Sequence, residues 1–290
     1  MRYRILHRTS YVYSERVTIS HHAARLRPRA LKLQECEEFT LSFRPEPAVR
    51  KERTDFFGNE IQFFSVQELH PGLAITAQSL VTVFPRLVVH PAQSPPWESV
   101  MELFEEPVMP DNVSPYQFIF DSHLVQSSPE LAVYAQPSFA AGRPMIEGAR
   151  DLCHRIHQDF KFDPTATTVA TPLAEVIKER QGVCQDFAHV GIGCLRSMGL
   201  PARYVSGYLR TVPPEGKPRM VGADASHAWF SVYCPSLGWV DMDPTNDLIP
   251  SEDHITVAFG RDYADVSPVA GVLTGGGGHE VSVSVDVEAI

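Results

Sequence analysis

A cysteine, a histidine and an aspartate in the C-terminal half of this chain have the types and order that nucleophilic catalysis requires. Cys184 lies in Gly-Val-Cys-Gln-Asp-Phe-Ala-His, His227 in Ser-His-Ala-Trp, and Asp243 in Met-Asp-Pro-Thr-Asn. A thiol nucleophile needs a base beside it, and the base needs a third group that orients its ring. These three residues are therefore the candidate nucleophile, base and orienting carboxylate of an enzyme.

The segment that begins at Cys184 is predicted to form a helix with one buried face. Its apolar residues keep a 3.6-residue period until Gly199, at positions Phe187, Val190, Gly191, Cys194, Leu195 and Met198. Cys184 falls in the first turn on that face. Unpaired backbone N–H groups and the positive end of the helix dipole stabilise a thiolate there, and they could also hold an oxyanion.

His227 and Asp243 are predicted to lie on the two strands of one hairpin. The alternating residue pattern of a strand starts at His227, the chain turns near Gly238, and the return strand runs to Asp243. If Ser231 pairs with Trp239, His227 lies directly opposite Asp243, and Trp229 lies opposite Asp241. Opposite side chains have Cβ atoms about 4.5–5.5 Å apart, and a slip of one residue would separate them onto different faces.

The remaining chain predicts three regions of an α+β protein. Residues 1–90 carry strand patterns and suit a β-sandwich-like domain, and residues 91–140 suit a proline-rich connector with a short helix. Residues 141–290 form the core that holds Cys184, with a loop rich in Pro and Gly from Thr211 to Asp224. Alternating valines from Val281 to Val287 predict a strand after the glycine run at 275–278.

Composition excludes several classes of partner. The net charge of -10 over 290 residues argues against binding to nucleic acid or to an anionic membrane. The five cysteines are odd in number and lack the paired spacing of a zinc site or a disulfide framework. No signal peptide or membrane span is recognised, so a cytoplasmic location is expected. The pairs His21-His22 and His154/His157 lack a third ligand nearby, so neither a metal nor another cofactor is expected.

Around these residues the chain resembles the bacterial transglutaminase-like superfamily, whose core has a papain-like Cys, His and Asp. Segments 4–13, 26–29 and 55–59 are similar to the N-terminal region of bacterial members, and 260–268 to the segment after the catalytic Asp. The resemblance implies a β-sandwich-like N-terminal domain followed by a papain-like/transglutaminase core, in which the nucleophile helix packs on an antiparallel β-sheet.

The resemblance also implies roles for individual residues. Cys184 matches the nucleophile, His227 the base and acid, and Asp243 the orienting carboxylate, because it directly precedes Pro-Thr-Asn; Asp241 is the competing carboxylate. Animal cross-linking enzymes stabilise the oxyanion with an upstream Trp that has no counterpart here, so the oxyanion donors are unassigned beyond the Cys184 backbone N–H, which is one candidate. Further candidates for substrate binding or for support of these three are Asp186, His189, Tyr208, Ser226, Trp229, Asp241, Asn246 and Tyr263.

The expected reaction is acyl transfer from a peptide or carboxamide through a thioester on Cys184. Hydrolysis, as in a cysteine peptidase or amidase, is favoured over transamidation of protein glutamine by a second amine. Two other classes stay open: a non-catalytic binding or scaffold protein that keeps the fold, and a metallohydrolase with Cys184, His227 and Asp243 as ligands. A peptide or protein substrate is the expected partner, and the oligomeric state is not predicted.

Overall fold

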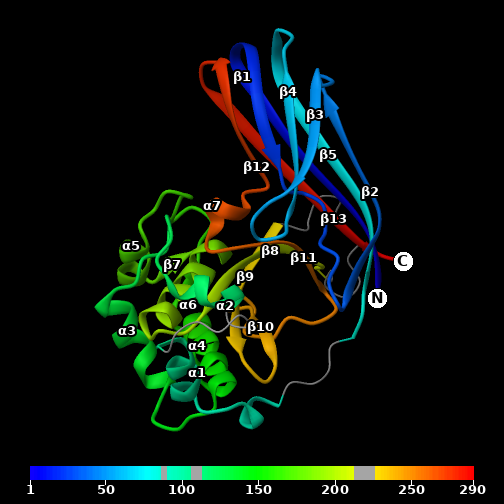
Figure 1. The fold of residues 1–290 in the computed structure, drawn as a ribbon. Helices are drawn as coiled ribbons and strands as arrows, with labels where there is room; N and C mark the ends of the chain where they lie inside the picture. Colours follow the sequence, from blue (N-terminus) through cyan, green and yellow to red (C-terminus); the bar gives the residue numbers. More distant parts are fainter. Residues whose placement is uncertain (86–89, 106–112, 212–225) are drawn as a thin grey trace, which may run out of the picture.

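Strands from both ends of the chain build the larger of two antiparallel β-sheets (Figure 1). The computed structural model describes residues 1–85, 90–105, 113–211 and 226–290. The large sheet has the order β2-β5-β1-β4-β3, with β12 and β13 also paired to β1. Its strands are β1 (Arg2–Ala24), β2 (Gln34–Arg44), β3 (Val49–Thr54), β4 (Glu60–Val66), β5 (His70–Val83), β12 (Val269–Gly275) and β13 (His279–Ala289).

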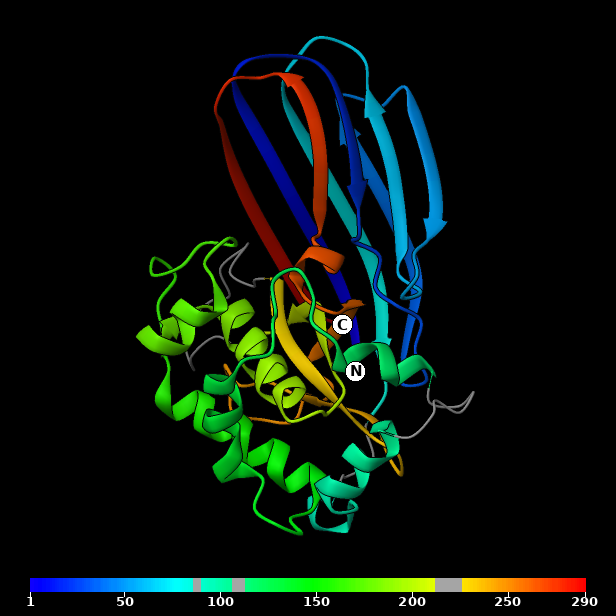
Figure 2. The ribbon, with the colours of Figure 1, turned by 60° about the vertical axis from the view of Figure 1, so that its left-hand side comes forward.

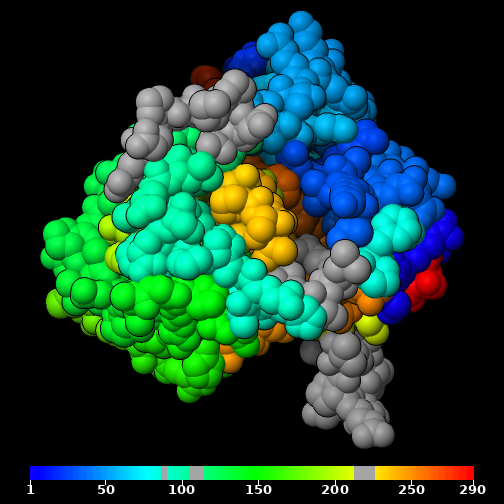
Figure 3. All heavy atoms as spheres, turned by 60° about the horizontal axis from the view of Figure 1, so that its bottom comes forward, coloured from blue at the N-terminus to red at the C-terminus, as the bar shows by residue number. Residues whose placement is uncertain are grey.

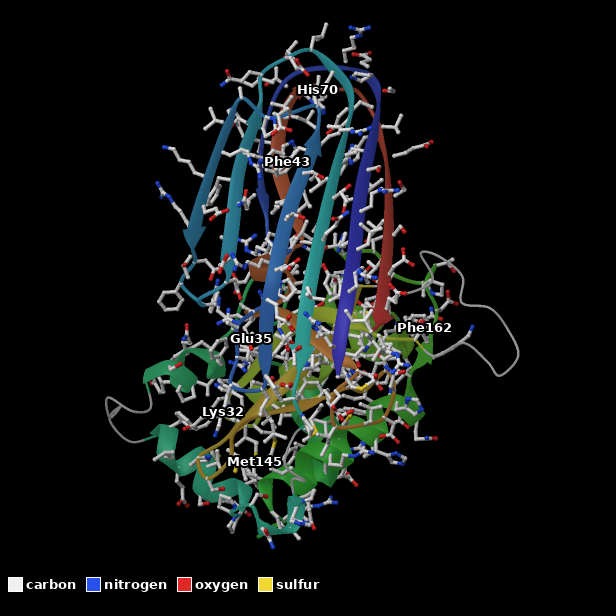
Figure 4. The ribbon with its side chains drawn as sticks, turned by 90° about the vertical axis from the view of Figure 1, so that its right-hand side faces the viewer. Lys32, Glu35, Phe43, His70, Met145 and Phe162 are labelled. Atoms are coloured by element: carbon white, nitrogen blue, oxygen red, sulfur yellow. The ribbon has the colours of Figure 1, made fainter. Side chains whose placement is uncertain are left out.

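The long strand β1 curls this sheet into two facing layers. Its first half pairs with β5 and β13, and its second half, from Ser20 to Ala24, pairs with β4 and β12. The pairing with β5 becomes irregular between Val12 and Val17, where β1 passes from one layer to the other. Apolar side chains fill the space between the layers, Phe43 among them (Figure 4). The ring centroids of Phe43 and Phe64 lie 4.3 Å apart. The N-terminal region is thus β-sandwich-like, as expected.

The last two strands belong to the N-terminal sheet although they follow the core in sequence. The strand predicted near Val281–Val287 is β13, and it lies against Tyr3–Tyr13 of β1. Glycines 275 to 277 have positive φ values and form the turn between β12 and β13. The backbone N–H of Ile290 donates to the carbonyl of Arg2 at 2.9 Å, so the two termini lie side by side (Figure 1). The end of the predicted 141–290 core therefore lies on the other sheet.

Helices gather at the end of the molecule that lies away from the tip of the large sheet (Figure 2). They are α1 (Trp97–Glu105), α2 (Val113–Tyr116), α3 (Pro129–Ala135), α4 (Met145–Asp159), α5 (Leu173–Glu179), α6 (Cys184–Ser197) and α7 (Tyr263–Val266). Figure 4 shows Met145 among these helices, far from His70 at the tip of the large sheet. The stretch expected to be a connector with one short helix carries α1, α2 and α3, and Leu131 of α3 packs on Gly193 of α6.

The nucleophile helix packs on a small antiparallel sheet, as predicted. The sheet has the order β10-β9-β8-β11. Its strands are β8 (Ala202–Leu209), β9 (Ser226–Cys234), β10 (Gly238–Met242) and β11 (His254–Gly260), and a short parallel pair, β6 (Lys161–Phe162) and β7 (Gln181–Gly182), lies apart from it. A Cβ at Gly191 would lie 2.4 Å from the ring of Phe230, so the helix axis comes close to β9. The loop predicted over 211–224 lies, after its first residue, outside the described residues.

Polar contacts join the large sheet to the small one. The Tyr208 hydroxyl on β8 hydrogen-bonds to Nδ1 of His7 on β1 at 2.9 Å. The Gln34 amide donates to the Thr256 carbonyl at 2.7 Å, and the Asn59 amide donates to the Phe259 carbonyl at 2.7 Å. From below, the gold surface of the β9–β10 region lies between the helices and the blue N-terminal region (Figure 3). In the part of the chain that the structure describes, no helix is both long and apolar enough to cross a bilayer.

Candidate active site

Cys184 is the first residue of α6, and its neighbours hold the helix start in place. The Asp186 carboxylate accepts hydrogen bonds from the Val183 backbone N–H at 2.8 Å and from the Thr167 hydroxyl at 2.6 Å. A Cβ at Gly182 would lie 2.5 Å from the same carboxylate oxygen, so only glycine leaves room for it. Burial, opposed by these hydrogen bonds, raises the pKa of Asp186. The Gly-Val-Cys-Gln-Asp sequence thus presents a half-buried Cys184 at a fixed helix N-terminus.

The β9–β10 hairpin has a different register from the predicted one. Ser231 pairs with Asp241, and Tyr233 pairs with Trp239, so the predicted pairing of Ser231 with Trp239 was wrong by two residues. The reason is the turn: Gly238 has a φ of 74° and pairs with Cys234, which centres the turn one residue later than predicted. A shift of two residues keeps every side chain on its predicted face.

Asp243 follows the last residue of β10 and is fully buried. Its Oδ2 lies 2.7 Å from Nε2 of His227. Its Oδ1 accepts from the backbone N–H groups of Thr245 at 3.0 Å and Asn246 at 3.3 Å, and the Asn246 side-chain amide donates to Oδ2 at 2.8 Å. Burial would raise the pKa of Asp243, but hydrogen bonds from His227, from His254 and from the Asn246 side chain hold it well below its usual range. The Pro-Thr-Asn turn therefore serves to hold an ionised carboxylate beside His227.

His227 connects the carboxylate to the thiol. Nε2 faces Asp243, and the side chain also interacts with Cys184, for which Nδ1 is the remaining ring nitrogen. Burial opposes a charged imidazole, but the hydrogen bond to Asp243 and the interaction with Cys184 outweigh it and raise the pKa of His227 to about 10. The imidazole is therefore protonated at neutral pH, where it can pair with a thiolate or give a proton to a leaving group.

A second histidine, absent from the sequence-based candidates, reaches the same carboxylate. His254 opens β11, and its Nε2 lies 2.9 Å from Oδ2 of Asp243. It is 2% exposed. No motif marks it in the sequence; the one available signal is that His254, like His227, directly precedes an apolar strand.

These groups also form the one cluster of three candidate metal ligands among the described residues. One ligand atom from each of His227, Asp243 and His254 lies within 4.8 Å of the others. The spacings of 2.7 and 2.9 Å between carboxylate and imidazoles are those of hydrogen bonds, which explain the cluster without an ion. Cys184 is not part of the cluster, so the ligand set considered from sequence, with Cys184, His227 and Asp243, does not converge on one point.

Helix α4 supports the turn that follows Asp243. Arg150 donates to the backbone carbonyl of Asp247 at 2.7 Å, and His154 hydrogen-bonds to the Asp247 carboxylate at 2.7 Å. His157 contacts the carbonyl of Thr245 at 3.1 Å. The pair His154/His157 thus holds a turn. In the other pair, His21 hydrogen-bonds to a serine, and His22 stacks on an aromatic ring.

The other candidates fall into two groups. Asn246 touches the triad directly, and the Trp229 ring lies 6.0 Å from that of His227. His189 is buried, which lowers its pKa to about 4, and its neutral ring accepts from the Tyr263 backbone N–H at 3.1 Å. Tyr204, whose ring lies 6.3 Å from that of Tyr263, interacts electrostatically with Cys184.

Three candidates lie outside the triad's hydrogen bonds. Tyr208 binds His7 of the large sheet instead. Asp241 accepts a short hydrogen bond from Ser231, which leaves Asp243 as the carboxylate in contact with His227. Ser226 is exposed at the start of β9.

Two family models match this chain. The model described as the bacterial transglutaminase-like N-terminal region matches residues 3–82, and the one described as the transglutaminase-like superfamily matches residues 133–244. An uncharacterized protein of Mycobacterium tuberculosis is 42% identical over 99% of this chain and 92% of its own length. An uncharacterized protein of Mycobacterium leprae is 32% identical over 99% of this chain and 98% of its own.

Two further similarities are to proteins whose names refer to an enzymatic activity. A protein-glutamine gamma-glutamyltransferase of Pseudomonas aeruginosa is 32% identical over 32% of this chain and 15% of its own length. The solved structure of a proposed cysteine protease from Cytophaga hutchinsonii has a TM-score of 0.77 and 21% identity, over 99% of this chain and 90% of that one. At that identity the likeness concerns the fold alone.

Proposed function

The chain belongs to the transglutaminase-like superfamily, and from this premise we propose that it is a cysteine-dependent enzyme that hydrolyses peptide or carboxamide bonds. One observation carries the proposal: His227 is hydrogen-bonded to Asp243 at 2.7 Å and also interacts with Cys184, which helps to raise the pKa of the imidazole. That is the geometry in which a carboxylate orients an imidazole and the imidazole activates a thiol.

The first step forms a thioester. The Cys184 thiolate attacks the carbonyl carbon of the substrate, and the oxyanion that develops faces backbone N–H groups at the start of α6. The C–N bond breaks as the imidazolium of His227 gives its proton to the departing amine. Asp243 keeps Nε2 of the ring engaged, so Nδ1 stays directed at the reacting atoms.

The second step regenerates the enzyme. Neutral His227 takes a proton from water, the water oxygen attacks the thioester carbon, and the C–S bond breaks to release a carboxylic acid and the thiolate. A primary amine in place of water would give a new amide, which is transamidation. Likeness in fold to a proposed cysteine protease supports hydrolysis, and partial similarity to a glutamyltransferase supports transamidation as the second candidate.

A non-catalytic scaffold protein would have no need for this buried network. Asp243 is fully buried and accepts hydrogen bonds at both oxygens, an arrangement that holds a charge where a scaffold could bury an apolar side chain. The intact network thus supports an enzyme over a binding protein.

The reaction class is tested with a library of peptides that includes glutamine side chains, incubated with the protein with and without a primary amine. Mass spectrometry of the products separates the outcomes: cleaved or deamidated peptides indicate hydrolysis, and amine adducts indicate transamidation. Cys184→Ala should abolish either product, whereas Cys36→Ala, which replaces a cysteine of similar burial on β2, should leave both unchanged. Turnover that survives in Cys184→Ala would refute the thiol mechanism.

A further inference from the structure

Three donors converge on a single oxygen of Asp243. Oδ2 lies 2.7 Å from Nε2 of His227, 2.9 Å from Nε2 of His254, and 2.8 Å from the side-chain amide of Asn246. His227 and Asn246 are part of the site described above, but His254 comes from another strand and makes no contact with the thiol. The proposed mechanism does not yet explain why His254 binds this carboxylate.

The sheet brings His254 to Asp243 across β8. His227 on β9 pairs with Gly207 on β8, and Gly207 pairs with Thr256 on β11, so His254 lies two residues away on the same face. A Cβ at Gly207 would lie 2.6 Å from the Trp229 ring and 2.2 Å from the Ile255 carbonyl. The glycine therefore lets the Trp229 ring reach over β8 and pack edge-on against His254, with ring centroids 5.2 Å apart.

The hydrogen bonds fix which ring nitrogen of each histidine carries a proton. An ionised carboxylate only accepts, so His227 and His254 both present Nε2–H to Asp243. Nδ1 of His254 is buried and has no hydrogen-bond partner among the described residues. The ring is thus held by the Asp243 contact at one end and by packing on Trp229, with no second polar partner to compete for its orientation.

We infer that His254 is a positioning residue: it holds Asp243 in place and, by donating to the oxygen that binds His227, weakens the hold of that carboxylate on the His227 proton. This inference rests on the proposed function, in which His227 must give its proton away during each turnover. A carboxylate oxygen that already accepts other hydrogen bonds stabilises a neighbouring imidazolium less strongly. His254 thus keeps His227 from being too weak an acid.

Other charged and titratable groups pack near this cluster from several elements. Cys153 on α4 interacts with Asp243, and burial raises its thiol pKa far above the usual value, so it stays neutral. Cys184 on α6 faces His227 from the other side. Asp253, the residue before His254, is bound by Tyr3 and Arg210. None of these groups donates a hydrogen bond to Asp243 in the described structure, so His254 can be varied with the others in place.

The test is a titration of the His227 imidazole by NMR in three variants of the full chain. His254→Leu removes the donor, His254→Gln keeps an amide N–H near the position of Nε2, and His254→Asn is polar but too short to reach Oδ2. We expect the pKa of His227 to rise by about one unit in His254→Leu and His254→Asn, and to stay near the wild-type value in His254→Gln. kcat should fall in the first two with KM unchanged, and the alkaline limit of kcat/KM should shift upward by the same amount.

A control variant separates this effect from general loss of packing. His22 is a buried histidine on β1, stacked on Phe64 and distant from the site in sequence and contacts. His22→Leu should change thermal stability without moving the His227 titration. The inference is overturned if the His227 pKa is the same in all three His254 variants. That titration needs no substrate. It therefore tests the role of His254 even if turnover survives in Cys184→Ala and the proposed function is wrong.

Discussion

Asp243 contacts His227 diagonally across the β9–β10 hairpin. Asp241 pairs with Ser231, so the continued register places Asp243 opposite Trp229 and not opposite His227. The 2.7 Å hydrogen bond between Oδ2 and Nε2 spans this diagonal, which long side chains on one face can bridge. His227, the base and acid of the proposed mechanism, and its orienting carboxylate are thus joined by side-chain reach and by the turn after Asp243, and not by direct pairing.

Removing the charge of Asp243 should impair catalysis more than substrate binding. In Asp243→Asn the amide can donate as well as accept, so it no longer selects the His227 tautomer with Nδ1 free for the thiol. We expect kcat to fall on the order of 10²- to 10⁴-fold with KM nearly unchanged. Asp241→Asn is the matched control, because Asp241 lies two residues before Asp243 but binds Ser231, and its kcat should stay within about threefold of wild type. Equal losses in the two variants would argue against the assignment of Asp243.

The thiol should influence the titration of His227. Burial lowers the pKa of this imidazole, but interactions with Asp243 and Cys184 raise it to about 10. Cys184→Ala removes one of the raising interactions, so the pKa of His227 measured by NMR should fall. An unchanged pKa in Cys184→Ala would mean that the two side chains do not interact in solution.

The same pKa shift predicts how stability depends on pH. The pKa of His227 is raised in the folded protein from 6.5 to about 10, so the folded state holds the proton more tightly than the unfolded chain does. This stabilisation is fully present below pH 6.5 and is lost as the pH rises through about 10. The free energy of unfolding, measured by chemical unfolding, should fall between pH 6 and pH 10 in both proteins. The fall should be smaller in His227→Gln than in wild type. A loss of the same size in both proteins would contradict the prediction.

Gly182 and Asp186 should act together on the start of α6. A Cβ at Gly182 would lie 2.5 Å from the Asp186 carboxylate, so Gly182→Ala should cost about 1–3 kcal/mol in the free energy of unfolding and slow alkylation of Cys184. In the double variant with Asp186→Ala the contact with the carboxylate is removed and only the 2.9 Å contact with the Cβ of residue 186 remains, so the combined cost should be smaller than the sum of the two single costs. Urea unfolding of the four proteins measures this coupling, and strict additivity would show that the contact does not constrain the helix start.

The elements that carry the triad could be predicted because local patterns define them. The 3.6-residue period of apolar residues after Cys184 predicted the helix that is α6, and the alternating pattern from His227 predicted the strand that is β9. Alternation fixes the face of a side chain but not the offset between two strands, which depended here on the left-handed conformation of Gly238. The predicted register was therefore wrong, while the contact between His227 and Asp243 survived because the error was an even number of residues.

Other features depend on contacts between distant parts of the chain and leave no local signature. His254 reaches Asp243 only because β11 lies beside β8, and a single histidine before an apolar strand does not reveal this. Val281 and its neighbours predicted a strand, but only the folded chain places β13 against β1 at the opposite end of the sequence. Helices α1 to α3 were hidden by the high proline content of their region, which suggested an irregular connector.

The most direct test of the proposed mechanism is intact-protein mass spectrometry after brief exposure to an activated ester, followed by digestion to locate the modified residue. A thioester intermediate predicts one acyl group per chain, located on Cys184, formed in Cys36→Ala and absent from Cys184→Ala. An acyl group on another residue, or none at all while peptide turnover continues, would contradict the assignment of Cys184 as the nucleophile.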